Sequence, residues 1–353
     1  MSTVDWNALE DFSSRLSQPG LQLGTVPDDE WKLIEKALGS FNENKDWRSI
    51  IKLRELFNDL FARDTLGGSE LLKELDQKAI EAARQVDDKA ELAHLLGARG
   101  HNYHRQGYHR NAIEVFDESA KLYWEIGEDF PALKSYYMTS LCYRALGDRN
   151  RAKKILNDVI EKTDLNDGWY GQPVQVLAWL ARDEGRLQDA ENLLWQALEL
   201  HKRLNDPDML VAGTLADLGE IISIQGRTDE AKRLFDESLS VIHNHEGQYD
   251  RQEARTLLKY SETLMHQKDY SGAIKFLNQA DAKASRYGHY YDLLWQIELA
   301  KAIIYLRQSD FINCYYKLRS VFRIRRYLDL PASYFILFVL RRYFQRILNR
   351  NKQ

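Results

Sequence analysis

The sequence predicts an all-α protein built as a solenoid of antiparallel helix pairs. A short phrase with a small anchor residue recurs six times, at intervals of 38 to 42 residues. Apolar residues around each anchor are spaced three and four positions apart, which places them on one face of a helix. Only six prolines occur in 353 residues, so long stretches can stay helical.

Each copy of the phrase is a polar turn followed, five residues later, by the small anchor. The anchors are Ala112, Ala152, Ala190, Ala231, Ala273 and Cys314. The turn residue is Gly107, Gly147, Gly185, Gly226, Lys268 and Ser309. Glycine at a helix C-terminus adopts the left-handed conformation without steric cost, and a small anchor lets a second helix approach the first. Each copy therefore predicts two helices joined by a tight turn.

This phrase resembles the tetratricopeptide repeat. Gly100, Tyr103, Ala112 and Phe116 fit the family pattern well, and later copies fit it in part. The observed period exceeds the usual 34 residues and looks like the extended repeats of bacterial regulatory and scaffold proteins. The resemblance implies a right-handed superhelix whose first helices line a concave inner surface.

The elements divide the chain into four expected parts. Residues 1–28 form an N-terminal extension, and residues 29–87 form degenerate repeats or an N-terminal cap. Residues 88–328 hold six repeats, and residues 329–353 form a basic, aromatic C-terminal helix. Because the terminal units of a solenoid must close its core, we expect this last helix to be a cap. Its alternatives are a docking surface for a partner and a contact with anionic lipid.

Charge is distributed unevenly along the chain. The net charge is −4, yet residues 317–353 carry ten basic residues against one acidic residue, which leaves −13 for residues 1–316. This basic tail offers a second contact site, with Arg341, Arg342, Arg346 and Arg350. Nucleic-acid binding ranks below protein binding, because no helix-turn-helix, zinc-finger or RNA-binding signature accompanies the arginines.

No constellation of catalytic residues is present, so we expect a protein that is not an enzyme and needs no cofactor. Phosphate-binding loops and the HExxH and GxSxG motifs are absent from the sequence. Cys142 and Cys314 stand outside any CxxC or Cys/His motif, so we expect a reducing, cytoplasmic location and no metal site. His101 and His104 can share a helix face, but zinc would need a third ligand, for which a carboxylate of the next repeat is the candidate.

The inner surface is the candidate binding site. By the register that the resemblance implies, it is basic and aromatic in its first half, with His101, His104, Arg105, Lys134, Tyr137, Arg144, Gln175, Trp179 and Arg182. Arginine and aromatic side chains together are typical of binding hot spots, and such a groove suits an acidic or C-terminally carboxylated peptide. The expected function is a scaffold or adaptor that binds a protein or peptide. The alternative is a regulator that responds to a peptide or ligand, and exposed repeat ends also allow self-association.

Overall fold

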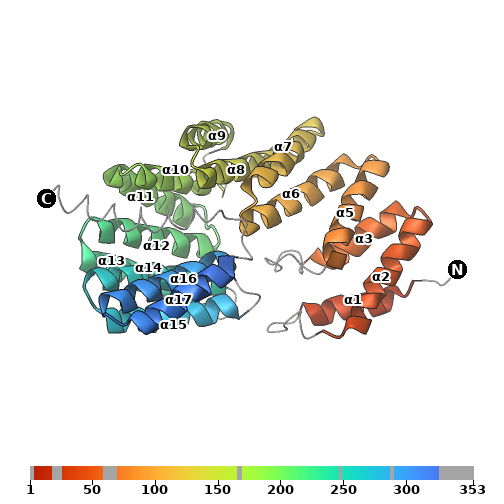
Figure 1. The fold of residues 1–353 in the computed structure, drawn as a ribbon. Helices are drawn as coiled ribbons and strands as arrows, with labels where there is room; N and C mark the ends of the chain where they lie inside the picture. Colours follow the sequence, from red (N-terminus) through yellow and green to blue (C-terminus); the bar gives the residue numbers. More distant parts are fainter. Residues whose placement is uncertain are drawn as a thin grey trace.

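The computed structural model describes residues 4–17, 26–58, 70–164, 169–245, 249–286 and 290–325. Within these ranges the chain forms sixteen helices and no strand. The helices follow one another into a curved superhelical array with the N-terminal helices at one end (Figure 1). The predicted all-α solenoid is therefore confirmed. No helix in these ranges is long and apolar enough to cross a lipid bilayer.

Four helices form the N-terminal part, and they share one apolar core. They are α1 (Trp6–Leu16), α2 (Asp28–Glu43), α3 (Trp47–Leu56) and α5 (Glu70–Gln85). An ion-pair cluster fastens this part to the next helix. Asp76 of α5 accepts from Arg54 Nε at 3.0 Å and from Arg99 Nε at 2.8 Å. Since only 1% of Arg54 is exposed, the Asp76 carboxylate is needed to stabilise its buried positive charge.

The following twelve helices form six antiparallel pairs. In chain order they are α6 (Lys89–Gln106) and α7 (His109–Glu125), α8 (Asp129–Leu146) and α9 (Arg149–Lys162), α10 (Gly171–Asp183) and α11 (Leu187–Arg203), α12 (Asp208–Ile224) and α13 (Thr228–His243), α14 (Asp250–His266) and α15 (Tyr270–Ser285), and α16 (Tyr291–Arg307) and α17 (Phe311–Ile324). The five anchor alanines are fully buried and Cys314 is 8% exposed, so each second helix packs closely on its first. We propose that this array corresponds to the expected domain of residues 88–328.

Every helix pair turns through one residue in the left-handed conformation. The four glycines of the recurring turn have φ between 81° and 90°. In the last two pairs Lys268 and Ser309 occupy the same place, with φ of 63° and 61°. Glycine is replaced at these two positions, but the backbone keeps the left-handed conformation. These two residues bear the steric cost that a Cβ atom meets in this conformation.

Replacing Lys268 by glycine should therefore stabilise the protein. Relief of the left-handed backbone outweighs the extra entropy of the unfolded chain, for an expected gain of about 0.5–1 kcal/mol. Urea unfolding of the full chain measures this gain. Gly226→Ala, at the equivalent turn, should change stability in the opposite direction. Equal stability of Lys268→Gly and the unmodified chain would mean that the lysine is not strained.

Two core contacts recur at equivalent repeat positions. A Cβ atom added to Gly100 would lie 2.6 Å from the ring of Phe116, and one added to Gly219 would lie 2.8 Å from the ring of Phe235. The aromatic ring of the second helix thus lies directly on the backbone of the first. This pairing fixes how closely the two helices of a repeat approach each other.

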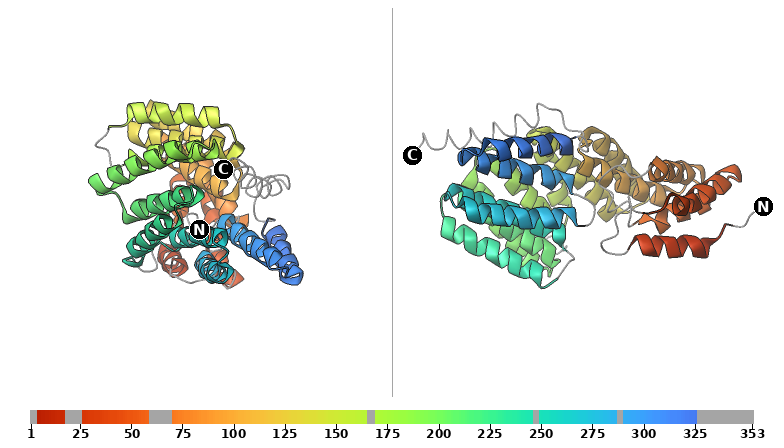
Figure 2. Two further views of the ribbon diagram at one scale, coloured as in Figure 1. Left: turned by 90° about the vertical axis from the view of Figure 1, so that its left-hand side faces the viewer. Right: turned by 60° about the horizontal axis from the view of Figure 1, so that its bottom comes forward.

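The first helices of successive pairs form an inner layer. α12 contacts α14, and α14 contacts α16, in addition to their own pair partners. The views in Figure 2 show that the array curves along its length. Inner helices of different repeats therefore lie beside one another.

Candidate binding surface on the inner helices

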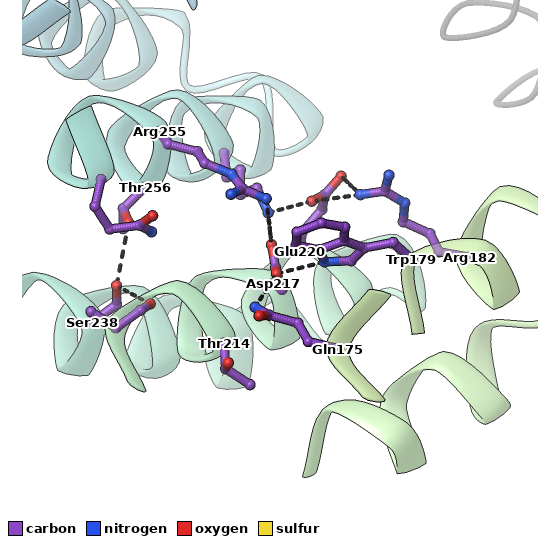
Figure 3. A network of polar contacts seen from close by, with 12 residues as sticks. Gln175, Trp179, Arg182, Thr214, Asp217, Glu220, Ser238, Arg255 and Thr256 are labelled. Atoms are coloured by element: carbon purple, nitrogen blue, oxygen red, sulfur yellow. Dashed lines mark hydrogen bonds and ion pairs between the residues drawn. The ribbon is translucent and has the colours of Figure 1, made fainter. Parts of the chain in front are cut away.

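A buried carboxylate, Asp217, lies at the centre of a polar network on the inner layer (Figure 3). Only 2% of Asp217 is exposed. Its Oδ2 atom accepts from Gln175 Nε2 at 2.8 Å and from Trp179 Nε1 at 2.7 Å, both on α10. Its Oδ1 atom accepts from Arg255 at 3.3 Å and from Lys259, both on α14. One side chain of α12 thereby joins three inner helices.

The network continues along the layer through alternating charges. Glu220 of α12 accepts from Arg182 at 3.1 Å with each oxygen and contacts Lys259 Nζ at 2.8 Å. Asp183 accepts from Arg182 at 3.0 Å and from Arg144 of α8 at 2.9 Å. The side chain of Asp183 is only 25% exposed, because two arginines converge on it.

Trp179 is the aromatic centre of this surface. The guanidinium carbons of Arg144 and Arg255 each lie 5.2 Å from the centroid of its ring. Its indole N–H is committed to Asp217, so ring and hydrogen bond hold the side chain in one orientation. Trp179 remains half-buried. The network contains four cationic side chains and three carboxylates, so cations exceed anions by one within it.

The charges around Asp217 control its ionisation. Burial alone would raise the pKa of this carboxyl, but Lys259 and Arg255 outweigh burial and hold its pKa below the usual value. A carboxyl group whose pKa is depressed by folding stabilises the protein above its unfolded pKa of about 3.9. That contribution disappears as the pH falls through the folded pKa.

Lowering the pH should therefore reduce the stabilisation that the Asp217 carboxylate gives to the folded chain. We expect the difference in unfolding free energy between the unmodified chain and Asp217→Asn to be largest near neutral pH. It should shrink as the pH falls below about 4. Urea unfolding of both proteins over that range measures it. A difference that stays constant with pH would show that the Asp217 carboxylate gains nothing from its cationic neighbours.

The predicted groove residues of the first repeat lie outside the Asp217 network. The His101 ring meets Phe116 edge-on, with centroids 5.2 Å apart. His104 Nδ1 lies 3.4 Å from the Cys142 sulfur. Burial and neighbouring cationic groups lower the pKa of His104 to about 3, so its imidazole is neutral.

Arg105 and Lys134 also stay outside the network. Arg105 donates to Asn102 on its own helix. The ammonium of Lys134 lies 4.2 Å from the centroid of the Phe130 ring. Neither of these contacts involves Trp179 or another residue of the network.

The structure brings five of the nine predicted groove residues together. Arg144, Gln175, Trp179 and Arg182 belong to the network, and the buried Tyr137 lies beside it, where Arg144 and Arg255 oppose the rise in its pKa that burial causes. The most connected member, Asp217, was not predicted. Its signal is an acid surrounded by apolar residues in the middle of α12, since a buried charge requires partners. Arg341, Arg342, Arg346 and Arg350 lie outside the described residues.

Comparison with known proteins supports the repeat and the fold. Residues 133–161 and 175–208 match two family models, each described as a tetratricopeptide repeat. No curated protein matches the sequence significantly.

Solved structures share the architecture at low sequence identity. The Rap conjugation gene regulator of plasmid pLS20, in complex with a Phr peptide, is 13% identical with a TM-score of 0.63; the match covers 92% of this chain and 97% of that one. Aspartyl phosphate phosphatase F from Bacillus subtilis is 14% identical with a TM-score of 0.59, covering 91% and 79%. A Rap protein complexed with competence and sporulation factor is 12% identical with a TM-score of 0.57, covering 91% and 97%. These likenesses show a common helical-repeat fold.

Proposed function

Because the chain carries tetratricopeptide repeats, we propose that it binds a peptide or a segment of another protein on its inner surface, centred on Trp179. The observation that carries the proposal is the half-buried Trp179 ring with a guanidinium 5.2 Å away on each of α8 and α14. A rigid aromatic side chain flanked by arginines loses little entropy on binding and contributes strongly to affinity.

The charge of the network favours a partner with an acidic group. Arg144 and Arg182 are already paired with carboxylates, so they position the site more than they offer free charge. Arg255 differs, because its side chain is 36% exposed and its one bond to Asp217 is long, at 3.3 Å. A carboxylate of a bound peptide can therefore engage Arg255 without dismantling the network.

Peptide-responsive regulation is the second candidate. The network connects α8, α10, α12 and α14, so a ligand that alters it acts on four repeats together. One of the structurally similar proteins was solved with a peptide bound, and another was solved with competence and sporulation factor. A peptide with different affinity for two curvatures of the array would shift the chain toward one of them.

The proposal includes no reaction, no cofactor and a cytoplasmic location. The inner surface presents paired charges and an aromatic ring, and these are suited to recognition. Cys142 and Cys314 are both free thiols, which suits a reducing compartment. Catalytic turnover by the purified chain would contradict this part of the proposal.

A random peptide library displayed on phage tests the binding function. The peptides that bind best are resynthesised and titrated against the purified chain by calorimetry. Trp179→Ala should weaken binding at least tenfold, because truncation of a hot-spot side chain costs about 2 kcal/mol or more. Arg255→Ala should weaken the binding of acidic peptides more than the binding of neutral peptides.

The matched control is Trp195→Ala. Trp195 lies on α11, outside the inner layer, and is 42% exposed. It should bind the same peptides with unchanged affinity. Circular dichroism shows whether each variant is folded. If folded Trp179→Ala and Arg255→Ala proteins bind as tightly as the unmodified chain, the inner surface is not the binding site.

The expected C-terminal cap falls outside the described residues, and we retain it as a proposal. α17 exposes large apolar side chains, with Phe311 68% and Ile312 72% exposed. An apolar helix provided by residues 331–349 would cover them. Phe335→Asp/Phe338→Asp should then lower the melting temperature and increase binding of a hydrophobic dye, whereas Arg350→Ala should do neither. A doubly substituted protein with unchanged melting temperature and dye binding would contradict the cap.

A further inference from the structure

Two histidines and a cysteine converge where the first repeat meets the second. His104 lies in the last turn of α6, His109 begins α7, and Cys142 lies on α8. One nitrogen of each imidazole and the Cys142 sulfur all lie within 4.8 Å of one another. Three different helices thus direct ligand atoms of the kind that zinc prefers to one point.

The distance between the sulfur and one imidazole nitrogen matches that of a tetrahedral site. The Cys142 sulfur lies 3.4 Å from His104 Nδ1. In tetrahedral zinc coordination, with Zn–N near 2.0 Å and Zn–S near 2.3 Å, a nitrogen and a sulfur ligand are about 3.5 Å apart. The rings of His104 and His109 have centroids 5.2 Å apart and are tilted by 55°, so they are not stacked face to face. The remaining pairs of ligand atoms lie within 4.8 Å, so a bound ion would draw them closer together.

The chemistry of the set selects a class of metal. Imidazole and thiolate suit Zn²⁺ and Co²⁺, whereas Mg²⁺ and Ca²⁺ prefer oxygen ligands. Cys142 is fully buried, but both histidines are half-buried, so an ion can approach from their side. Three protein ligands leave one position for water or for a group of a bound partner.

This arrangement was not evident in the sequence. The sequence predicted no metal site, and His101, which could share a helix face with His104, packs its ring edge against Phe116. The only predicted candidate for a third ligand was a carboxylate of the next repeat. Cys142 is the residue of that repeat which reaches His104, across a separation of 38 residues. One repeat period brings the two side chains together, which no local Cys/His motif reveals.

We propose that His104, His109 and Cys142 form a zinc-class metal site that links the first helix pair to the second. Bound metal would hold the turn between α6 and α7 against α8. It would therefore fix the angle between two repeats at one end of the inner surface. This site is independent of the proposed peptide binding at Trp179.

Cobalt titration of the purified, metal-free full chain tests the site. Co²⁺ bound to a thiolate gives a ligand-to-metal absorption band in the near ultraviolet, and tetrahedral coordination gives strong visible bands. We expect both, saturating at one Co²⁺ per chain, and we expect Zn²⁺ to abolish them. Cys142→Ser should remove the near-ultraviolet band, while His104→Ala and His109→Ala should each weaken binding at least tenfold.

Matched controls separate this site from adventitious binding. Cys314→Ser removes the other thiol, and His101→Ala removes a nearby imidazole, so both should retain the spectrum and the stoichiometry. Circular dichroism of each metal-free variant verifies folding. Absence of the thiolate band in the unmodified chain, or its persistence in Cys142→Ser, would overturn the proposal. Neither result would bear on peptide binding at Trp179.

Discussion

Replacing Asp217 by alanine should lower the free energy of unfolding by about 3–5 kcal/mol, because it removes one partner from a buried ion pair. Lys259 would remain 9% exposed without its closest carboxylate. The donors of Gln175 and Trp179 would lose the oxygen that accepts from both. Urea unfolding measures the loss, and hydrogen exchange should locate it on α10, α12 and α14.

Two further variants identify the source of this loss. Adding Lys259→Met to Asp217→Ala removes a buried ammonium that keeps Glu220 but has lost Asp217, so part of the lost stability should return. Glu237→Ala is the matched control, since Glu237 pairs with Lys202 at 3.5 Å and both side chains are about half exposed. An exposed pair contributes about 0–1 kcal/mol. If Asp217→Ala costs no more than Glu237→Ala, the network does not stabilise the array.

The fold was predictable from the sequence because one pattern is repeated six times. Each anchor alanine and each left-handed turn residue reports a local requirement, and several copies reinforce one another. Lys268 and Ser309 show that the pattern survives even where glycine is lost, since neighbouring repeats impose the backbone conformation.

The binding surface was only partly predictable. The register that places Arg144, Trp179 and Arg182 on the inner layer follows from the repeat. Their partners do not, because pairing across repeats depends on which long side chains meet after the array curves. Arg144 pairs with Asp183 across 39 residues, and Trp179 pairs with Asp217 across 38. The sequence separations of these partners follow the repeat period. Whether an α10 side chain pairs with Asp217 or with Glu220 depends on side-chain packing.

Replacing Phe235 by alanine should cost about 3–5 kcal/mol, the usual loss for a fully buried phenylalanine. Its ring is completely buried between Gly219 and Tyr260, and it stacks on the Tyr260 ring at 5.0 Å. Gly219 has no side chain that can move into the space, so most of the cavity would remain. Chemical unfolding measures the loss, and Leu306→Ala, at a side chain 51% exposed, should cost about 0.5 kcal/mol or less.

The same substitution at Phe116 distinguishes a local effect from a global one. Phe116 packs on Gly100 in the first repeat as Phe235 packs on Gly219 in the fourth. Because each repeat of a solenoid contacts only its neighbours, each variant should lose hydrogen-exchange protection mainly in its own and adjacent repeats. A loss below about 1 kcal/mol for Phe235→Ala would mean that α13 moves onto α12 and closes the cavity. Uniform loss of protection along the whole array would instead show that the described repeats unfold as one cooperative unit.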